Sequence, residues 1–174
     1  MSKWTWNPAT GNDVAAMLNM AIEHFQQEID DIFQPEPIAY SRNLTIAVVN
    51  SFYMPNTEMI AVARDHSYRI VAYTWARRET APWSDDPMAL VRMAHVDLAL
   101  DARDRVRLVK EMMQLWEAWA QQSGLKIICS TTMRREQQAF LRLHTASGYD
   151  VRGSYAYKKL DTTQATPANS LSPS

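Results

Sequence analysis

A strand, a tight turn and a long helix in the middle of the chain constrain its fold more than any other feature. Side chains in residues 88–100 alternate between two faces, which is the period of a strand. One face carries Arg92, Ala94, Val96, Leu98 and Leu100, and the other carries Met93, His95, Asp97 and Ala99. Apolar residues then recur at three- and four-residue intervals, which predicts a helix packed on a sheet. They are Val106, Val109, Met112, Met113, Trp116 and Trp119.

The ends of that helix carry suitable capping residues. Asp101 can cap its first turn, and Gly124 lies where a C-terminal glycine is expected. Because a strand that leads directly into a helix brings free backbone N–H groups together, the turn between them is a candidate anion-binding site.

The remaining pattern predicts a single domain over residues 1–160 of the 174. The expected elements are a strand at 3–8, a helix from Thr10 or Asn12 to about 33, a helix at 41–52, a hairpin of strands 57–64 and 68–77, a strand at 125–130, a helix at 134–146, and a final strand pair at 149–152 and 154–160. The expected inward residues of the three shorter amphipathic helices are Val14, Leu18, Ala21, Ile22, Phe25, Ile29 and Phe33, then Leu44, Ala47, Val48 and Phe52, and finally Phe140, Leu141 and Leu143.

Composition argues against several function classes. The chain has 18 basic and 19 acidic residues and no basic block, which argues against nucleic acid and anionic membranes as partners. No apolar run reaches membrane-spanning length, and the N-terminus lacks a signal-peptide core, so we expect a protein that is neither secreted nor membrane-spanning. The single cysteine, Cys129, excludes an intramolecular disulfide, and its apolar strand setting predicts inert packing. No cluster with metal-ligand spacing is present.

The last fourteen residues, 161–174, form a low-complexity tail rich in Thr, Ser, Pro and Ala. Such a segment cannot bury enough apolar surface to offset its loss of conformational entropy. We therefore expect the tail to be ordered only where it docks on a partner.

The order of elements, with a strand–turn–helix at its centre and a late helix ending at Gly148-Tyr149, resembles the Gcn5-related N-acetyltransferase (GNAT) superfamily. The resemblance implies an α/β (α+β) fold: a central mixed, mostly antiparallel sheet of about six to seven strands flanked by about four helices. In that family an Arg/Gln-x-x-Gly-x-Gly/Ala turn cradles the pyrophosphate of coenzyme A with backbone amides.

This chain departs from that signature. With Met112-Met113 aligned to the family's paired leucines, Asp104 takes the leading slot, and Arg107 and Val109 take the glycine slots. No glycine occurs between Leu100 and Ser123. The resemblance therefore implies a degenerate cradle, with side chains where the phosphates would lie.

Residues with useful chemistry remain near that turn. Arg103, Arg105 and Arg107 can bind phosphate through their guanidinium groups. The other interpretation, which we favour from the sequence, is a basic edge that faces solvent or a partner.

The family's late helix has an Asn near coenzyme A and a Tyr as general acid; here Gln137 and His144 occupy those slots. A histidine capping the helix C-terminus is an equally good explanation of His144. On the central strand, His95 and Asp97 share a face, either as a general-base pair or as an ordinary satisfied polar pair.

Two functions follow. The first, which the sequence favours, is a non-catalytic structural or assembly component without a cofactor, because RDRVRLVKEMMQLWEAWA and FLRLHTASGYDVRGSYAYKKL are similar to degenerate GNAT-like virion and internal proteins of short-tailed bacteriophages. Its partners would be other virion proteins, its location the virion or the host cytoplasm, and its contacts exposed aromatic residues: Trp4, Trp6, Trp83 or Tyr155.

The alternative is an acetyl-CoA-dependent N-acetyltransferase acting on an amine. It would use His95 or Asp97 as base and His144 as acid, with the cofactor held by Arg103, Arg105, Arg107 and Gln137. A third class, a nucleic-acid binder, rests only on the short RDRVR run.

Overall fold

The computed structural model describes residues 3–29 and 33–153, which form three layers. In chain order its elements are β1 (Thr5–Pro8), the 3-10 helix η1 (Gly11–Asp13), α1 (Val14–Gln27), α2 (Pro37–Tyr53), β2 (Glu58–Arg64), β3 (Ile70–Thr80), β4 (Pro87–Val96), α3 (Ala102–Gln122), β5 (Ile127–Ser130) and α4 (Gln138–Ala146). The five strands form one sheet in the order β1-β2-β3-β4-β5. The first four are antiparallel, and β5 runs parallel to β4.

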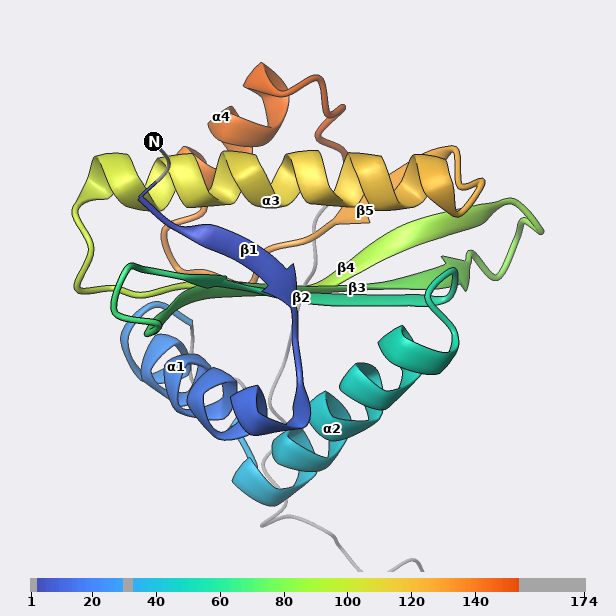
Figure 1. Cartoon of the computed structure of the whole chain (residues 1–174). Coiled ribbons are helices and arrows are strands. Elements are labelled where there is room, and N and C mark those ends of the chain that lie inside the picture. Colours follow the sequence, from blue (N-terminus) through green and yellow to red (C-terminus); the bar gives the residue numbers. More distant parts are fainter. Residues whose placement is uncertain (1–2, 30–32, 154–174) are drawn as a thin grey trace, which may run out of the picture.

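Helices cover both faces of this sheet: α1 and α2 lie on one face, and α3 and α4 lie on the other (Figure 1). Each face has its own core. The α3 side is centred on Trp116, Leu108 and Met112, and the α1–α2 side is centred on Met17, Leu44 and Tyr73. The predicted apolar face of α3 is confirmed from Val109 to Trp119, but Val106 is 46% exposed and Leu108 takes its place in the core.

Strand β1 is fixed to α3 by a carboxylate. Glu111 accepts hydrogen bonds from the indole N–H groups of Trp4 and Trp6, the latter at 2.9 Å, and pairs with Arg107 at 3.1 Å. The Arg107 guanidinium also lies 5.2 Å from the Trp4 ring centroid. Trp4 is therefore buried, which corrects the expectation that it is an exposed contact; Trp6 is half-buried and Trp83 is 86% exposed.

Several predicted boundaries were wrong. Helix α1 ends at Gln27 rather than near residue 33, and α2 begins four residues earlier than expected because Pro37 starts it: the Glu36 side chain caps the helix and proline suits a first turn. Residues 149–152 form no strand, and the predicted strand 154–160, Tyr155 and the tail lie outside the described residues. Helix α4 begins at Gln138 rather than 134, β4 ends at Val96, and β5 begins at Ile127. Two residues predicted to face inward, Phe33 and Phe52, are exposed.

Candidate functional site

The candidate site begins at a bulge in β4. Met93 pairs with Trp75 and Val91 pairs with Ala76, so Arg92 is an extra residue in β4. The bulge exchanges the two faces of the strand: Val91 packs in the α3-side core, whereas Met93, two residues on, packs in the α1-side core. The predicted alternation holds only after Arg92.

Strand β5 leaves β4 at the same place. The last residues that pair are Val91 and Ser130, so β4 has no β5 partner from Arg92 onward. Side chains from elsewhere take up two carbonyls of that stretch. The Arg134 guanidinium donates to Ala94 O at 3.4 Å, and His24 Nε2 donates to Val96 O. The sheet is therefore opened at the C-terminal half of β4.

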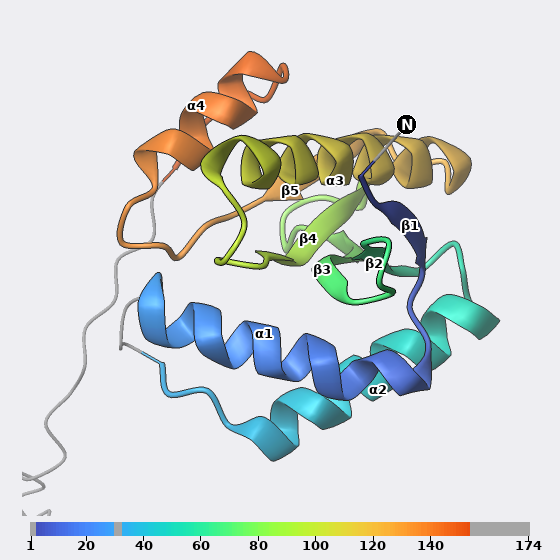
Figure 2. The ribbon, with the colours of Figure 1, turned by 60° about the vertical axis from the view of Figure 1, so that its left-hand side comes forward.

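A cleft of about 510 Å³ lies beside this opening. Its wall includes the end of β4, the first turns of α3, the start of α4 and the end of α1. The loop between β5 and α4 passes the end of α1 (Figure 2), where Arg135 N–H donates to Glu28 O at 3.0 Å. The cleft thus lies at the turn between β4 and α3 that the sequence marked as a candidate anion site.

Three arginines and two glutamates line the cleft: Arg105, Arg134, Arg135, Glu28 and Glu136. Glu28 pairs with Arg134 at 3.2 Å and with Arg105 at 3.6 Å. Among the described residues, Arg105 Nε is buried and has no hydrogen-bond acceptor. Burial lowers the pKa of the Arg134 guanidinium, an effect that Glu28 opposes. One carboxylate shared by two guanidinium groups leaves donor capacity for an anion.

The other two predicted arginines do not line this cleft. Arg107 is turned toward Trp4 and Glu111, on the side of α3 that faces β1, and Arg103 is exposed in the first turn. The two residues in the family's glycine slots, Arg107 and Val109, lie well inside α3, which begins at Ala102. Their N–H groups are therefore committed to the helix. Asp101 caps that helix as predicted, accepting from Asp104 N at 2.8 Å.

His95 and Asp97 are not brought together. Asp97 pairs with Arg69 and accepts from Ala99 N at 2.8 Å. His95 is buried, and neither of its ring nitrogens has a hydrogen-bond partner among the described residues. Its ring contacts His24 edge-on, with centroids 4.8 Å apart, and Tyr73 at 5.0 Å. The expected general-base pair of His95 and Asp97 is therefore absent, and His95 instead contacts a second imidazole, that of His24.

Both imidazoles are held neutral. Burial lowers the pKa of His24. Burial also places the pKa of His95 well below its ordinary value, and the neighbouring His24 lowers it further. Because the carbonyl of Val96 only accepts, the hydrogen-bond pattern assigns the proton of His24 to Nε2 and leaves Nδ1 unprotonated. His24 lines the cleft, and His95 lies behind it.

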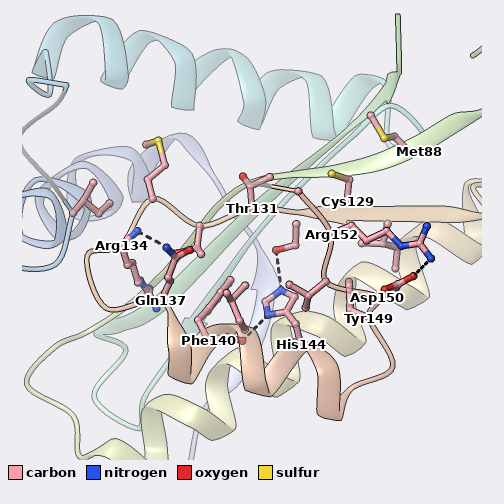
Figure 3. A pocket seen from close by; sticks show the side chains of 18 of the residues that line it. Met88, Cys129, Thr131, Arg134, Gln137, Phe140, His144, Tyr149, Asp150 and Arg152 are labelled. Atoms are coloured by element: carbon pink, nitrogen blue, oxygen red, sulfur yellow. Dashed lines mark hydrogen bonds and ion pairs between the residues drawn. The ribbon is translucent and has the colours of Figure 1, made fainter. Parts of the chain in front are cut away.

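His144 lies in a second groove, of about 590 Å³, along β5 and α4 (Figure 3). Its Nδ1 is 2.9 Å from Phe140 O, and its Nε2 is 3.0 Å from Ser130 Oγ. Gln137 lines the same groove, as does Cys129, whose pKa burial raises. His144 and Gln137 therefore line a different groove from Arg105 and His24, although Arg134, Arg135 and Phe140 line both.

In the part of the chain that the structure describes, no group of three or more His, Cys, Asp or Glu side chains is placed to hold a metal ion. No helix in residues 3–29 or 33–153 is both long and apolar enough to cross a bilayer.

Comparisons with known proteins support the fold. No protein-family model matches the sequence, and no curated protein matches it. Solved acetyltransferase structures match over nearly the whole chain. A possible acetyltransferase from Clostridium difficile 630 is 8% identical, covers 92% of this chain and 100% of its own, and has a TM-score of 0.65. The aminoglycoside 6'-N-acetyltransferase AAC(6')-Ih from Acinetobacter baumannii is 14% identical, with 91% and 98% covered and a TM-score of 0.64.

A predicted acetyltransferase from Clostridium acetobutylicum, solved with acetyl-CoA, is 10% identical, with 90% and 96% covered and a TM-score of 0.67. The chain therefore has the α+β fold of the GNAT acetyltransferases, with five strands among the described residues instead of the six to seven expected. At these identities the similarity establishes the fold and not the activity.

Sequence reasoning missed His24 and Ser130. His24 follows Met17 and Ala21 at helical spacing, so the apolar stripe of α1 could have indicated that it is buried. Ser130 ends an apolar strand, a position that gave no chemical signal before its contact with His144 was known.

Proposed function

We propose that this protein is an acetyl-CoA-dependent N-acetyltransferase that binds coenzyme A in the cleft beside the β4–α3 turn. The observation that carries the proposal is the opening of the sheet after Val91 and Ser130, next to a cleft with a cationic wall. The acetyltransferases with the same fold support it, including the one solved with acetyl-CoA.

The residues lining the cleft fit a phosphate-bearing ligand. Arg105 contributes a buried Nε that has no acceptor among the described residues, and Arg134 lies across Glu28 from it. Guanidinium groups bind phosphate oxygens without requiring glycine in the main chain. Side chains would thus replace the glycine cradle that the sequence lacks, and this favours the enzyme over the non-catalytic function.

The chemistry needs an acetyl donor and a proton acceptor. Acetyl-CoA supplies an activated acetyl group when it is bound. His24 lines the cleft as a neutral imidazole whose Nδ1 can accept the proton of an amine. Asp97 is committed to Arg69, so we assign it no part in proton transfer.

Amine-dependent release of coenzyme A from acetyl-CoA tests this proposal. A panel should include a polyamine, an aminoglycoside, a lysine peptide and an aromatic amine, because the acceptor is not fixed by the geometry. We expect at least one amine to be acetylated, and His24→Gln to lower kcat by roughly a hundredfold or more. His66→Gln, in the exposed β2–β3 loop, is the matched control and should leave kcat unchanged. Release at the rate of spontaneous hydrolysis with every amine would refute the proposal.

We propose as a second candidate a structural role, like that of the GNAT-like phage virion proteins, in which α2 packs against another copy of this chain. Helix α2 has a single charged residue, Arg42, and it is apolar on the outside as well as toward the sheet. Ile38 and Phe52 are each 79% exposed, and the exposed apolar set is Ile38, Ile46, Val49, Phe52 and Tyr53. Soluble monomers rarely expose this many large apolar side chains on one helix.

Sedimentation velocity over a range of concentrations tests that role. We expect a dimer that Val49→Glu converts to a monomer, whereas Gln114→Glu on the exposed side of α3 leaves it intact. A wild-type chain that stays monomeric up to about 100 µM, a hundredfold above a micromolar Kd, would exclude α2 as a self-association surface.

A further inference from the structure

Ser130, at the end of β5, and His144, in the last turn of α4, form a hydrogen-bonded pair that takes no part in the proposed coenzyme A site. Ser130 Oγ lies 3.0 Å from His144 Nε2, and His144 Nδ1 lies 2.9 Å from the carbonyl oxygen of Phe140. Because a carbonyl only accepts, the pattern assigns the imidazole proton to Nδ1. The unprotonated Nε2 therefore accepts the hydrogen bond of the Ser130 hydroxyl. A general base requires this tautomer, in which the nitrogen that faces the nucleophile is free to take its proton.

The fold fixes the orientation of this imidazole. His144 lies in the last turn of α4 and is buried between Phe140 and Tyr149, with ring centroids 4.2 and 4.9 Å away. The Phe140 carbonyl and the C-terminal end of α4 both favour the positive charge that the ring carries after Nε2 accepts a second proton. Burial opposes this and lowers the pKa of His144, so the ring is neutral at neutral pH and ready to accept one.

The hydroxyl is accessible although the histidine is not. Ser130 is half-buried and lines the groove along β5, whereas His144 is only 3% exposed. Apolar side chains flank the groove, among them Ile127, Met133 and Val151. Nucleophile, base and the carbonyl that orients the base are thus arranged in series, with the half-buried Ser130 at one end and the Phe140 carbonyl at the other. Figure 3 shows His144 beside Phe140 in this groove.

We propose that Ser130 and His144 form a catalytic pair that attacks activated acyl esters in the β5 groove. His144 Nε2 accepts the hydroxyl proton as Ser130 Oγ bonds to the carbonyl carbon. The bond to the leaving oxygen then breaks, the leaving group keeps the electron pair, and His144 returns the proton to it. Water attacks the acyl-serine by the same steps and releases the carboxylic acid. This activity requires neither coenzyme A nor the cleft at the β4–α3 turn.

A fluorophosphonate probe tests the pair directly, because it modifies activated serine hydroxyls. The Ser130 Oγ–P bond forms, the P–F bond breaks, and fluoride leaves with its electron pair while His144 takes the proton. We expect one adduct per chain, mapped to Ser130 by peptide mass spectrometry. Ser130→Ala should abolish the adduct, and His144→Gln should slow its formation about a hundredfold or more. Cys129→Ala is the matched control and should label as the wild type does.

Two wild-type measurements make the test independent of whether His144→Gln folds. The labelling rate should fall with acid below the lowered pKa of His144, and nitrogen NMR should find the imidazole proton on Nδ1. Burial raises the pKa of Tyr149 to about 12 and also raises that of Cys129, while Asp150 pairs with Arg152 at 2.5 Å. A fall in the labelling rate below pH 6.5, the ordinary pKa of histidine, therefore reports His144.

Each of the opposite results would overturn the proposal. They are no adduct at Ser130, a labelling rate that does not fall in acid, a proton on Nε2, or an unchanged rate in a folded His144→Gln variant. Hydrolysis of p-nitrophenyl acetate should agree with the labelling: the wild type should hydrolyse this ester, and Ser130→Ala should not.

Discussion

Three of the four histidines are buried, and burial lowers the pKa of each, although their local partners differ. His24 donates to a main-chain carbonyl at the opened edge of β4, and His144 lies between a carbonyl and a serine hydroxyl. His95 has no hydrogen bond among the described residues and is surrounded by His24, Phe25 and Tyr73. Only His66 is exposed. Burial therefore ties the stability of the fold to pH.

Because His95 is buried, the free energy of unfolding should fall as the pH is lowered. In the unfolded chain His95 has a pKa near 6.5, whereas in the folded chain burial places its pKa well below that. Its contribution is fully present above about pH 6.5 and is lost as pH falls from there toward the folded-state pKa, at up to about 1.4 kcal/mol per pH unit.

Urea unfolding at pH 7.5, 6.5 and 5.5 measures this loss. We expect His95→Leu to reduce the pH dependence of the free energy of unfolding, with His24 and His144 supplying the remainder, and His66→Gln to leave it unchanged. A free energy of unfolding that is equal at pH 7.5 and 5.5 would contradict a neutral, buried His95.

At this scale the sequence singled out His95 and His144 but not their partners. The tertiary contacts that decide their chemistry join residues far apart in the chain: His24 and Val96 are 72 residues apart, and Ser130 and His144 are 14 apart. A spacing argument paired His95 with Asp97, whereas the structure gives Asp97 to Arg69. The arginines show the same limit, because only packing shows which of Arg103, Arg105 and Arg107 lines the cleft.

Among the elements, α3 is the best predicted and the most heavily anchored. Its cap at Asp101, its apolar face and the glycine after it all follow from periodicity and capping residues. The hairpin of β2 and β3 is likewise confirmed. The bulge at Arg92 could not be predicted, because one extra residue in a strand leaves an apolar pattern that still reads as alternation.

Gly124 ends α3 in a left-handed conformation, with φ of +67°, and a Cβ there would meet no other atom. We therefore expect Gly124→Ala to destabilise the fold by about 1 kcal/mol through backbone strain alone. Gly11→Ala is the control, because its Cβ would also meet nothing and its φ is not positive. Equal thermal midpoints for the two variants would show that the helix ends differently.

Glu111 joins β1 to α3 by accepting from Trp4, Trp6 and Arg107. Glu111→Gln keeps the shape but removes the charge from these hydrogen bonds, so we expect a loss of about 1–3 kcal/mol in chemical denaturation. Glu117→Gln, the same substitution at an exposed site of α3, should cost less than about 0.5 kcal/mol. If the two losses are equal, Glu111 does not anchor β1.

For the whole molecule, the order of elements was enough to predict the acetyltransferase fold, which structural similarity at 8–14% identity supports. The sequence was a weaker guide to function, because its preference for a non-catalytic role depended on the missing glycine signature. That signature describes a main-chain cradle, whereas the folded chain places arginine side chains beside the same turn. The phage assembly role and the tail's docking on a partner stay predictions.

The most direct test of the account is a calorimetric titration of the wild-type chain with coenzyme A, accompanied by thermal unfolding. We predict saturable 1:1 binding and a stabilisation of about 2–3 kcal/mol at a hundredfold excess over Kd. Arg105→Ala should weaken binding about tenfold or more, since it removes a guanidinium that faces the cleft. Arg107→Ala, on the other side of α3, should not weaken it. No heat and no shift in Tm at about a thousandfold excess over a micromolar Kd would contradict the account.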